Sequence, residues 1–290
     1  MGSRVKECIV CGGKDFNDYH GVLIKCAKCS LIVAREIPTK KEVDDLYKKE
    51  YFFGMEYFDY EADRPALERN FRVRIKSMQH MLGKEKNIVE IGCAYGYFMN
   101  LIKNNARSII GFDVTHDGVS FARNRLGLDA HTEDFMQYPF KDASIDSVFM
   151  WDVAEHLAYP DDYFKKIAKI LKKGGKVAIT TGNVEALVPK LRKGNWRMIH
   201  PPTHVYYFSP QTLGALLEKH GFKVESVRHR SVSRNVGSVF NQLISNNKAS
   251  SKNSVMLKVA HSAAKKLGAE KLNIPVNMFD IMEVVATKTS

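Results

Sequence analysis

Apolar and polar positions along this chain follow two alternating patterns. Four short apolar runs have the length and composition of strands that are buried on both faces. These runs lie at 88–91, 109–113, 147–151 and 176–180. Segments in which apolar residues recur at helical spacing lie at about 96–105, 116–126, 161–172 and 210–220. The alternation predicts an open parallel sheet with helices on both faces.

Further elements are expected on either side of this region. One apolar stripe predicts a helix from Pro65 to Leu82 that ends at Gly83. Past Arg234 we expect a helical insertion at about 236–270 and then a last strand near 280–287. The insertion contains a polar break and is interpreted as a lid, an element of a homodimer or a lipid-facing surface. The sequence does not decide among the three.

Composition places the chain among ordinary globular proteins. Of its 290 residues, 44% are hydrophobic and 26% are charged. No apolar run approaches the ~18 residues that a membrane span needs. The N-terminus lacks the apolar core of a signal peptide. We therefore expect a cytoplasmic protein with no transmembrane segment.

Positive charge is concentrated in the second half of the chain. Residues 1–150 carry 22 basic and 22 acidic residues, whereas residues 151–290 carry 22 basic and only 10 acidic ones. Several basic residues lie in or near the connection after the 176–180 run: Lys190, Arg192, Lys193, Arg197, Arg228, Arg230 and Arg234. This asymmetry favours an anionic partner. The alternative interpretation is solubilising surface charge.

Four of the five cysteines form two Cys-x-x-Cys pairs, Cys8 with Cys11 and Cys26 with Cys29. Fourteen residues separate the pairs, a spacing typical of a zinc ribbon. Two disulfides are the alternative, and the absence of an export signal disfavours them. Four thiolates leave no open coordination position, so the predicted Zn²⁺ is structural.

A connector follows the predicted ribbon. Thr39 and Glu42 form a capping-box start to a short helix. Aromatic residues then gather at Tyr47, Tyr51, Phe52, Phe53, Tyr57, Phe58 and Tyr60. They predict core packing under the ribbon, and a flap over a ligand is the alternative.

The stretch from Val89 to Phe98, VEIGCAYGYF, reads as a strand that breaks into a glycine turn before a helix. Ala94 and Tyr97 replace two glycines of the dinucleotide fingerprint, and the Gly-Lys-Ser/Thr of a P-loop is missing. Glu90-x-Gly92-x-x-x-Gly96, with Asp113 at the end of the next strand, instead resembles motif I of the class I S-adenosylmethionine-dependent methyltransferases.

This resemblance implies a Rossmann-like, seven-stranded α/β sheet with S-adenosyl-L-methionine at the carboxyl ends of its strands. Gly92 and Gly96 would allow close approach of the cofactor, and Asp113 would accept the ribose hydroxyls. Glu90 would face the amino-acid end of the cofactor. Asp134 resembles the acid that contacts the adenine amino group, and Phe135 resembles the residue that packs on the ring. The cofactor-binding set also includes Cys93, Ala94 and Asp152.

The segment after the 147–151 run extends the resemblance. Asp152, Glu155 and His156 are similar to the signature of ubiquinone-type methyltransferases, in which an acid-x-x-acid-His arrangement can bind a divalent metal. Asp152 is one methylene shorter than that pattern requires. A four-cysteine ribbon followed by such a domain resembles a bacterial and archaeal group that acts on sugars, lipids and secondary metabolites.

The connection from Asn183 to Ser209 is long enough to indicate a functional role. Its Pro-x-His pattern ends at His204, and in the enzymes that the chain resembles such an insertion covers the acceptor. A histidine that titrates near neutral pH suits removal of a proton from an alcohol or phenol. His204 and His156 are therefore the candidate catalytic bases.

We interpret residues 1–37 as a zinc ribbon, 38–64 as an aromatic-rich connector and 65–290 as the methyltransferase domain. The predicted activity is transfer of a methyl group to a small, anionic or glycosylated acceptor, with an oxygen nucleophile favoured. The alternative is an RNA or protein methyltransferase that grips its substrate with the basic half. A non-catalytic module that binds the cofactor is a third hypothesis.

Overall fold

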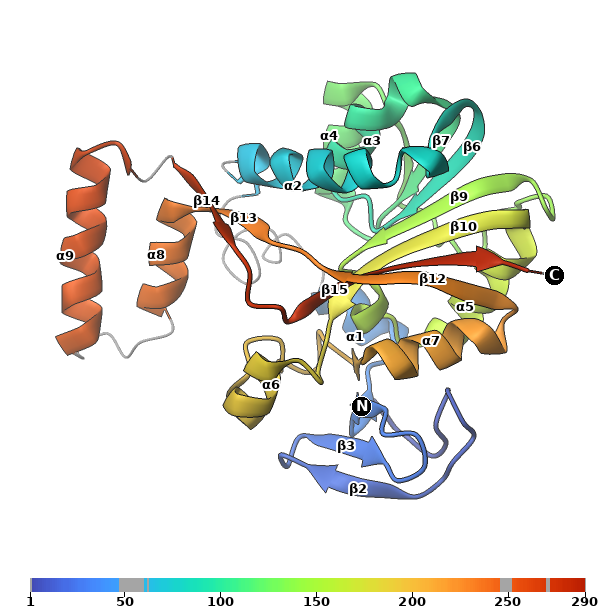
Figure 1. Cartoon of the computed structure of the whole chain (residues 1–290), viewed down its shortest axis with the longest axis horizontal. Coiled ribbons are helices and arrows are strands. Elements are labelled where there is room, and N and C mark those ends of the chain that lie inside the picture. Colours follow the sequence, from blue (N-terminus) through green and yellow to red (C-terminus); the bar gives the residue numbers. More distant parts are fainter. Residues whose placement is uncertain (1, 47–59, 62, 246–251, 270–271, 290) are drawn as a thin grey trace. The chain divides into compact units, whose positions relative to one another are not determined.

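The chain folds as two compact units in a computed structural model that describes residues 2–46, 60–61, 63–245, 252–269 and 272–289 (Figure 1). The first unit comprises Met1–Lys48, Met78–Arg230 and Met278–Ser290, and the second comprises Lys49–Ser77 and Ser231–Asn277. The aromatic positions of the connector from Tyr47 to Phe58 lie outside the described residues, as does most of the polar break. Tyr60 is described and is buried.

A seven-stranded sheet in the order β12-β15-β10-β9-β6-β7-β8 forms the centre of the first unit. Its strands are β6 (Gly83–Ile91), β7 (Ala106–Phe112), β8 (Asp129–His131), β9 (Ile145–Trp151), β10 (Leu171–Gly182), β12 (Phe222–His229) and β15 (Ile281–Lys288). The predicted Rossmann-like sheet is confirmed. It is mixed and not wholly parallel, because β15 runs antiparallel to both β10 and β12.

Helices cover both faces of this sheet (Figure 1). One face carries α3 (Tyr97–Ile102) and α4 (His116–Leu126), and the other carries α5 (Pro160–Ile170) and α7 (Pro210–Lys219). The strand centres pack without solvent contact: Val89, Val148 and Ile179 are all fully buried. The helix start predicted at Ser209 is confirmed, because its hydroxyl accepts the Thr212 N–H while the Thr212 hydroxyl accepts the Ser209 N–H.

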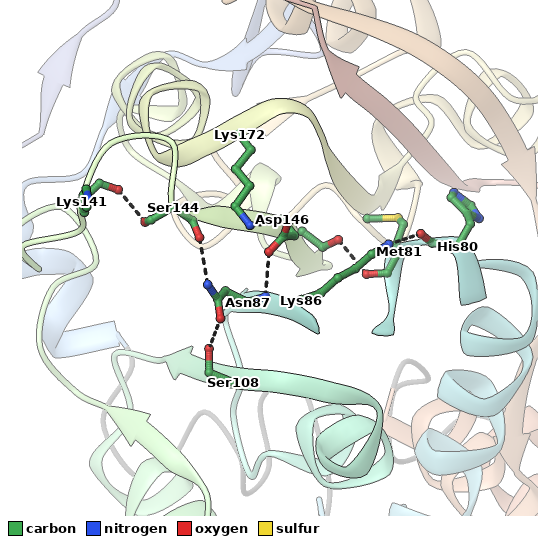
Figure 2. Close-up of polar contacts among 10 residues, drawn as sticks. His80, Met81, Lys86, Asn87, Ser108, Lys141, Ser144, Asp146 and Lys172 are labelled. Atoms are coloured by element: carbon green, nitrogen blue, oxygen red, sulfur yellow. Dashed lines mark hydrogen bonds and ion pairs between the residues drawn. The ribbon is translucent and has the colours of Figure 1, made fainter. Parts of the chain in front are cut away.

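Polar side chains tie together the amino-terminal ends of the central strands (Figure 2). The Asp146 carboxylate accepts the Asn87 N–H at 2.8 Å and the Lys172 ammonium at 2.7 Å. The Asn87 amide donates to the Ser144 carbonyl and accepts the Ser108 hydroxyl. These bonds fix the ends of β6, β7 and β9 that lie opposite the glycine turn.

The N-terminal segment (residues 2–37) contains β1 (Ser3–Arg4), β2 (Phe16–Tyr19), β3 (Leu23–Cys26), β4 (Ile32–Ala34) and β5 (Glu36–Ile37). A second sheet, in the order β11-β4-β3-β2, joins it to β11 (Tyr206–Tyr207) of the later connection. The predicted capping box begins α1 (Lys40–Leu46): the Thr39 N–H donates to the Glu42 carboxylate, and the Glu42 N–H donates to the Thr39 hydroxyl.

The second unit combines one helix before the sheet with the predicted insertion. Helix α2 (Arg64–Ser77) contacts β13 (Val232–Asn235) through Asn70. The Asn70 side-chain amide donates a hydrogen bond to the Ser233 carbonyl and accepts one from the Ser233 N–H. β13 pairs with β14 (Asn273–Val276). Between them lie α8 (Val236–Ser245) and α9 (Lys252–Lys266).

The predicted end of α2 was wrong, because the helix stops at Ser77 and Gly83 begins β6. A single 3₁₀ turn, Gln79–Met81, follows and brings the Met81 carbonyl to the Ser147 hydroxyl at 2.7 Å. Within the described ranges, no helix combines the length and hydropathy that crossing a bilayer requires.

Candidate functional site

The predicted cofactor residues gather at the carboxyl-terminal edge of the central strands. Ile91 is level with Phe112 of β7 and with Met150 of β9 in parallel registers. The glycine turn therefore begins beside Asp113, which directly follows β7. Asp152 follows β9 at the same edge, and its N–H donates to the Thr180 carbonyl and hydroxyl on β10.

The glycine turn adopts a backbone conformation that side chains rarely tolerate. Gly92 has φ +78° and Gly96 has φ +74°. A Cβ on Gly92 would lie 2.2 Å from a methyl group of Val153, and one on Gly96 would lie 2.6 Å from Leu128. The turn is therefore closely surrounded by its own protein, and both glycines are required by packing as well as by φ.

Asp113 is bonded to the glycine turn and to its own loop. Its Oδ2 accepts the Ala94 N–H at 2.8 Å, whereas its Oδ1 accepts the N–H and hydroxyl of Thr115. Burial raises the pKa of the Asp113 carboxyl, while the bonds from Thr115 and Ala94 lower it. Because Oδ1 already accepts two bonds, the remaining acceptor capacity lies mainly on Oδ2.

Glu90 is a buried acid at the end of β6. Burial raises its pKa well above the ordinary value, the nearby Asp113 charge adds to this, and a bond from the Met99 N–H opposes it. Its Oε2 has no hydrogen-bond partner among the residues that the structure describes. A buried carboxyl oxygen in this state is suited to a ligand donor. Cys93 is also buried and is a free thiol.

Lys166 of α5 holds the loop that carries Asp134 and Phe135. The Lys166 ammonium donates to three loop carbonyls, those of Phe135, Met136 and Tyr138, at 2.6, 3.0 and 2.8 Å. The Asp134 carboxylate accepts the Met136 N–H. Phe135 stacks on Tyr163 with ring centroids 5.6 Å apart and is buried within an aromatic cluster. The role of Lys166 was missed in the sequence, where it reads as one solvated lysine of a helix.

Three histidines lie together beside the edge of the sheet. Ring centroids are 4.3 Å apart for His156 and His204, and 3.8 Å apart for His200 and His204. The Nδ1 of His156 lies 2.9 Å from the Thr203 carbonyl, and that of His204 lies 2.8 Å from the Met198 carbonyl. A carbonyl can only accept, so both Nδ1 atoms carry the proton and Nε2 is the acceptor nitrogen of each neutral ring.

Burial keeps the rings of His156 and His204 neutral. It lowers the pKa of His156 to about 4, and His200 reinforces the effect while the bond to Thr203 opposes it. The pKa of His204 is lowered further, by burial and by the two neighbouring histidines. From the sequence we expected both rings to titrate near neutral pH, and this prediction was wrong.

Glu155 joins this cluster, whereas Asp152 does not. One donor atom each from Glu155, His156 and His204 lies within 4.8 Å of the others, and the Glu155 side chain is buried. The Asp152 carboxylate accepts the Thr180 hydroxyl at 2.9 Å. The donor set that could hold a divalent metal thus differs from the acid-x-x-acid-His pattern, because His204 takes the place of the first acid.

Two arginines of the predicted anion-binding set bind buried acids of this chain. Arg197 pairs with Asp280 at 3.1 Å, and Asp280 also accepts the Trp196 indole N–H. Arg230 pairs with Glu283 at 2.8 Å. Lys190, Arg192 and Lys193 remain exposed on or directly after α6 (Leu187–Arg192). Within the first unit, the exposed members of this basic set are therefore these three residues and Arg228 of β12.

The four cysteine sulfurs lie close together but form no disulfide. Cys8 and Cys29 have sulfurs 3.4 Å apart, and Cys11 and Cys26 have sulfurs 3.6 Å apart. A disulfide requires about 2.05 Å. Four sulfurs at ~2.3 Å from one Zn²⁺ stand ~3.8 Å from one another. Hydrogen bonds from the Cys29 and Lys28 N–H groups bring the pKa of Cys26 to about 7 against the opposing effect of burial.

Comparison with known proteins identifies related sequences. Residues 61–227 match the model of a methyltransferase domain family. A probable S-adenosylmethionine-dependent methyltransferase of Mycolicibacterium smegmatis is 30% identical over 141 residues, which cover 48% of this chain and 53% of that protein. The mitochondrial ubiquinone biosynthesis O-methyltransferase of Mus musculus is 25% identical over 169 residues, covering 52% and 46%. The chain thus spans about half the length of these relatives.

Solved structures share the fold. A methyltransferase dependent on S-adenosylmethionine from Archaeoglobus fulgidus superposes with a TM-score of 0.54, covering 83% of this chain and 100% of that chain. Its sequence identity is 19%, so this likeness bears on the fold alone.

The close packing of Gly92 gives a direct test of the turn. We expect Gly92→Ala to lower the free energy of unfolding by about 1–3 kcal/mol, from positive φ and overlap with Val153. Adding Val153→Ala should recover the part due to overlap and leave the part due to φ. Chemical denaturation of Gly92→Ala, Val153→Ala and the double variant measures this, and an unchanged stability of Gly92→Ala would contradict the described turn.

Proposed function

This chain belongs to the methyltransferase domain family, and we propose that it transfers the methyl group of S-adenosylmethionine to an oxygen of a small acceptor. The main observation behind this proposal is a hydrogen bond from the Ala94 N–H to the Asp113 carboxylate, which joins the glycine turn to the end of β7. This bond sets an acid beside a turn with two glycines at positive φ. Such an edge suits a ligand with hydroxyl and ammonium groups.

The cofactor contacts follow from the acids at this edge. Oδ2 of Asp113 would accept a ribose hydroxyl, and Oε2 of Glu90 would accept a donor at the amino-acid end. Asp134 would bind the adenine amino group from the loop that Lys166 fixes. Phe135 would support that loop by packing, because its ring is buried among other aromatic rings.

The histidine cluster would act at the acceptor. In the proposed reaction the acceptor oxygen forms a bond to the methyl carbon, and the bond from that carbon to sulfur breaks. S-adenosylhomocysteine leaves, and the proton of the hydroxyl passes to Nε2 of His156 or His204. A weakly basic imidazole is adequate, because an alkylated hydroxyl becomes strongly acidic as the carbon–oxygen bond forms.

The four cysteines have the donor set of a structural Zn²⁺ site. The two short sulfur–sulfur distances are close to the edge length of a ZnS₄ tetrahedron, which supports this assignment. A bound Zn²⁺ would be fully coordinated by Cys8, Cys11, Cys26 and Cys29 and would take no part in methyl transfer.

An anionic group on the acceptor would bind the exposed basic side chains of α6. Exposed Leu187 and Leu191 share this helix with Lys190 and Arg192, so it also offers apolar contact. The relatives include O-methyltransferases, one named for ubiquinone biosynthesis and one for fatty acids. A small acceptor with an anionic or glycosylated end and an apolar body fits this surface. An RNA or protein substrate is the second candidate, favoured by the charge asymmetry.

Cofactor binding tests the first part of the proposal. Asp113→Ala should weaken S-adenosylmethionine binding by about 1.5–3 kcal/mol, and Asp113→Asn, which keeps one acceptor oxygen, should lose less. Asp117→Ala removes an exposed carboxylate four residues later and should bind normally. Titration calorimetry decides the matter, and normal affinity in both Asp113 variants would reject the site.

Turnover tests the histidines. His204→Ala or His156→Ala should lower turnover by ~10²–10⁴-fold and leave cofactor affinity within about twofold, whereas the exposed His80→Ala should be neutral. His156 is neutral above its pKa of about 4, so activity should stay level through neutral pH and fall only as protons occupy Nε2 near that value. If neither variant loses more than a few-fold, or if a step appears near pH 6.5, these rings are not the base.

Salt and charge reversal distinguish the acceptor classes. Arg192→Glu with Lys193→Glu should raise the KM of a small anionic acceptor several-fold, by about 1 kcal/mol for contacts at an exposed surface. Lys141→Glu, at the opposite end of the sheet (Figure 2), is the matched control. A small anion predicts a shallow salt dependence of affinity, and RNA predicts a log–log slope of several units. A flat dependence would show that the basic residues only solubilise.

A further inference from the structure

Strand β11 connects the histidine cluster to the N-terminal segment. β11 pairs antiparallel with β4, with Tyr206 opposite Val33 and Tyr207 opposite Ile32. The Ala34 N–H donates to the Val205 carbonyl at 2.8 Å. His204 directly precedes this paired stretch. A strand from the first 37 residues therefore bonds to the backbone next to a histidine that follows it by some 170 positions in sequence.

The groups that orient His204 rest on the same segment. The Met198 carbonyl accepts the His204 Nδ1 proton, and the Tyr207 hydroxyl donates to the His204 carbonyl at 3.1 Å. Met198, Tyr207 and Trp196 belong to one apolar cluster with Leu23, Ile32 and Ala34 of the N-terminal segment. On its other side, the Val205 N–H donates to the Glu155 carbonyl. His204 thus lies between the N-terminal segment and the loop after β9.

The four cysteines hold the strand that pairs with β11. Cys26 ends β3, and its N–H donates to the Leu31 carbonyl at 2.8 Å across the turn that leads into β4. The short sulfur–sulfur distances join Cys8 to Cys29 and Cys11 to Cys26, so a central metal would bind one turn to the other. A segment this short has little core of its own, and metal binding commonly supplies its folding free energy.

We propose that the N-terminal segment is the positioning element for His204, and that Zn²⁺ bound to its four cysteines fixes it. The inference rests on the proposed function only in taking His204 as an acceptor-side residue. Loss of the metal would free β4, release β11 and move His204 from its place beside His156. The bond between Asp113 and the glycine turn uses no residue of the N-terminal segment, so cofactor binding should persist.

Hydrogen exchange of the full chain tests this coupling without an acceptor. The purified protein should contain one Zn²⁺ per chain. After the metal is removed with a chelator, amides of residues 198–208 should exchange about tenfold faster or more, whereas those of 88–98 should keep their rates. Faster exchange confined to residues 8–34 would overturn the proposal. So would a protein that carries no Zn²⁺.

A pair of variants provides a second test that keeps the metal in place, and it can be used if the metal-free protein aggregates. Ile32→Ala shortens a side chain that packs in the cluster with Tyr207, and it should speed exchange at 198–208 and lower kcat while the KM for S-adenosylmethionine stays the same. Asp18→Asn breaks an exposed ion pair with Arg35 in the same segment and should change neither. Equal exchange in the two variants would refute the coupling.

The outcomes separate this inference from the proposed function. Wild-type protein that fails to bind S-adenosylmethionine would refute the function and leave the exchange result standing. Normal cofactor binding with metal-independent exchange at 198–208 would refute the inference alone.

Discussion

The parallel pairing of β6 with β7 and β9 is the constraint on which the candidate site depends. Because these strands run in the same direction in register, their ends deliver the glycine turn, Asp113 and Asp152 to one edge. The bonds of Asp146 and Asn87 at the opposite edge hold that register (Figure 2). The turn itself has no room for a side chain at Gly92. In the proposed function, strand alignment therefore brings these cofactor groups together, and the loop with Asp134 supplies the contact to adenine.

The proposed acceptor side is built differently, from segments that are distant in sequence. His156 follows β9, His204 precedes β11, and β11 completes a sheet that begins in the N-terminal segment. Their Nδ1 protons are committed to carbonyls, so both rings present Nε2 as acceptor. The same burial that makes them weak bases keeps them unprotonated at neutral pH. In the proposed reaction a sulfonium activates the methyl group in advance, so a weak base at these positions would be adequate.

Much of the fold could be predicted because its signals are local. The apolar runs located four of the central strands, and Ser209 with Thr39 marked two helix starts. The glycine spacing predicted the turn that follows β6. Pairings over long separations left no such signal: β11 has two residues, and Arg197 and Arg230 bind acids that lie some 50 to 80 positions away. The lowered pKa of His156 could not be predicted either, because it arises from burial in the tertiary structure.

The most direct test of the proposed cofactor site is a crystal structure of the full chain with S-adenosylhomocysteine. We expect the ligand at the carboxyl-terminal edge, with a ribose hydroxyl on Asp113, the amino-acid end toward Glu90 and the sulfur facing the His156–His204 cluster. A ligand bound at another edge, or one whose sulfur faces away from both histidines, would contradict it.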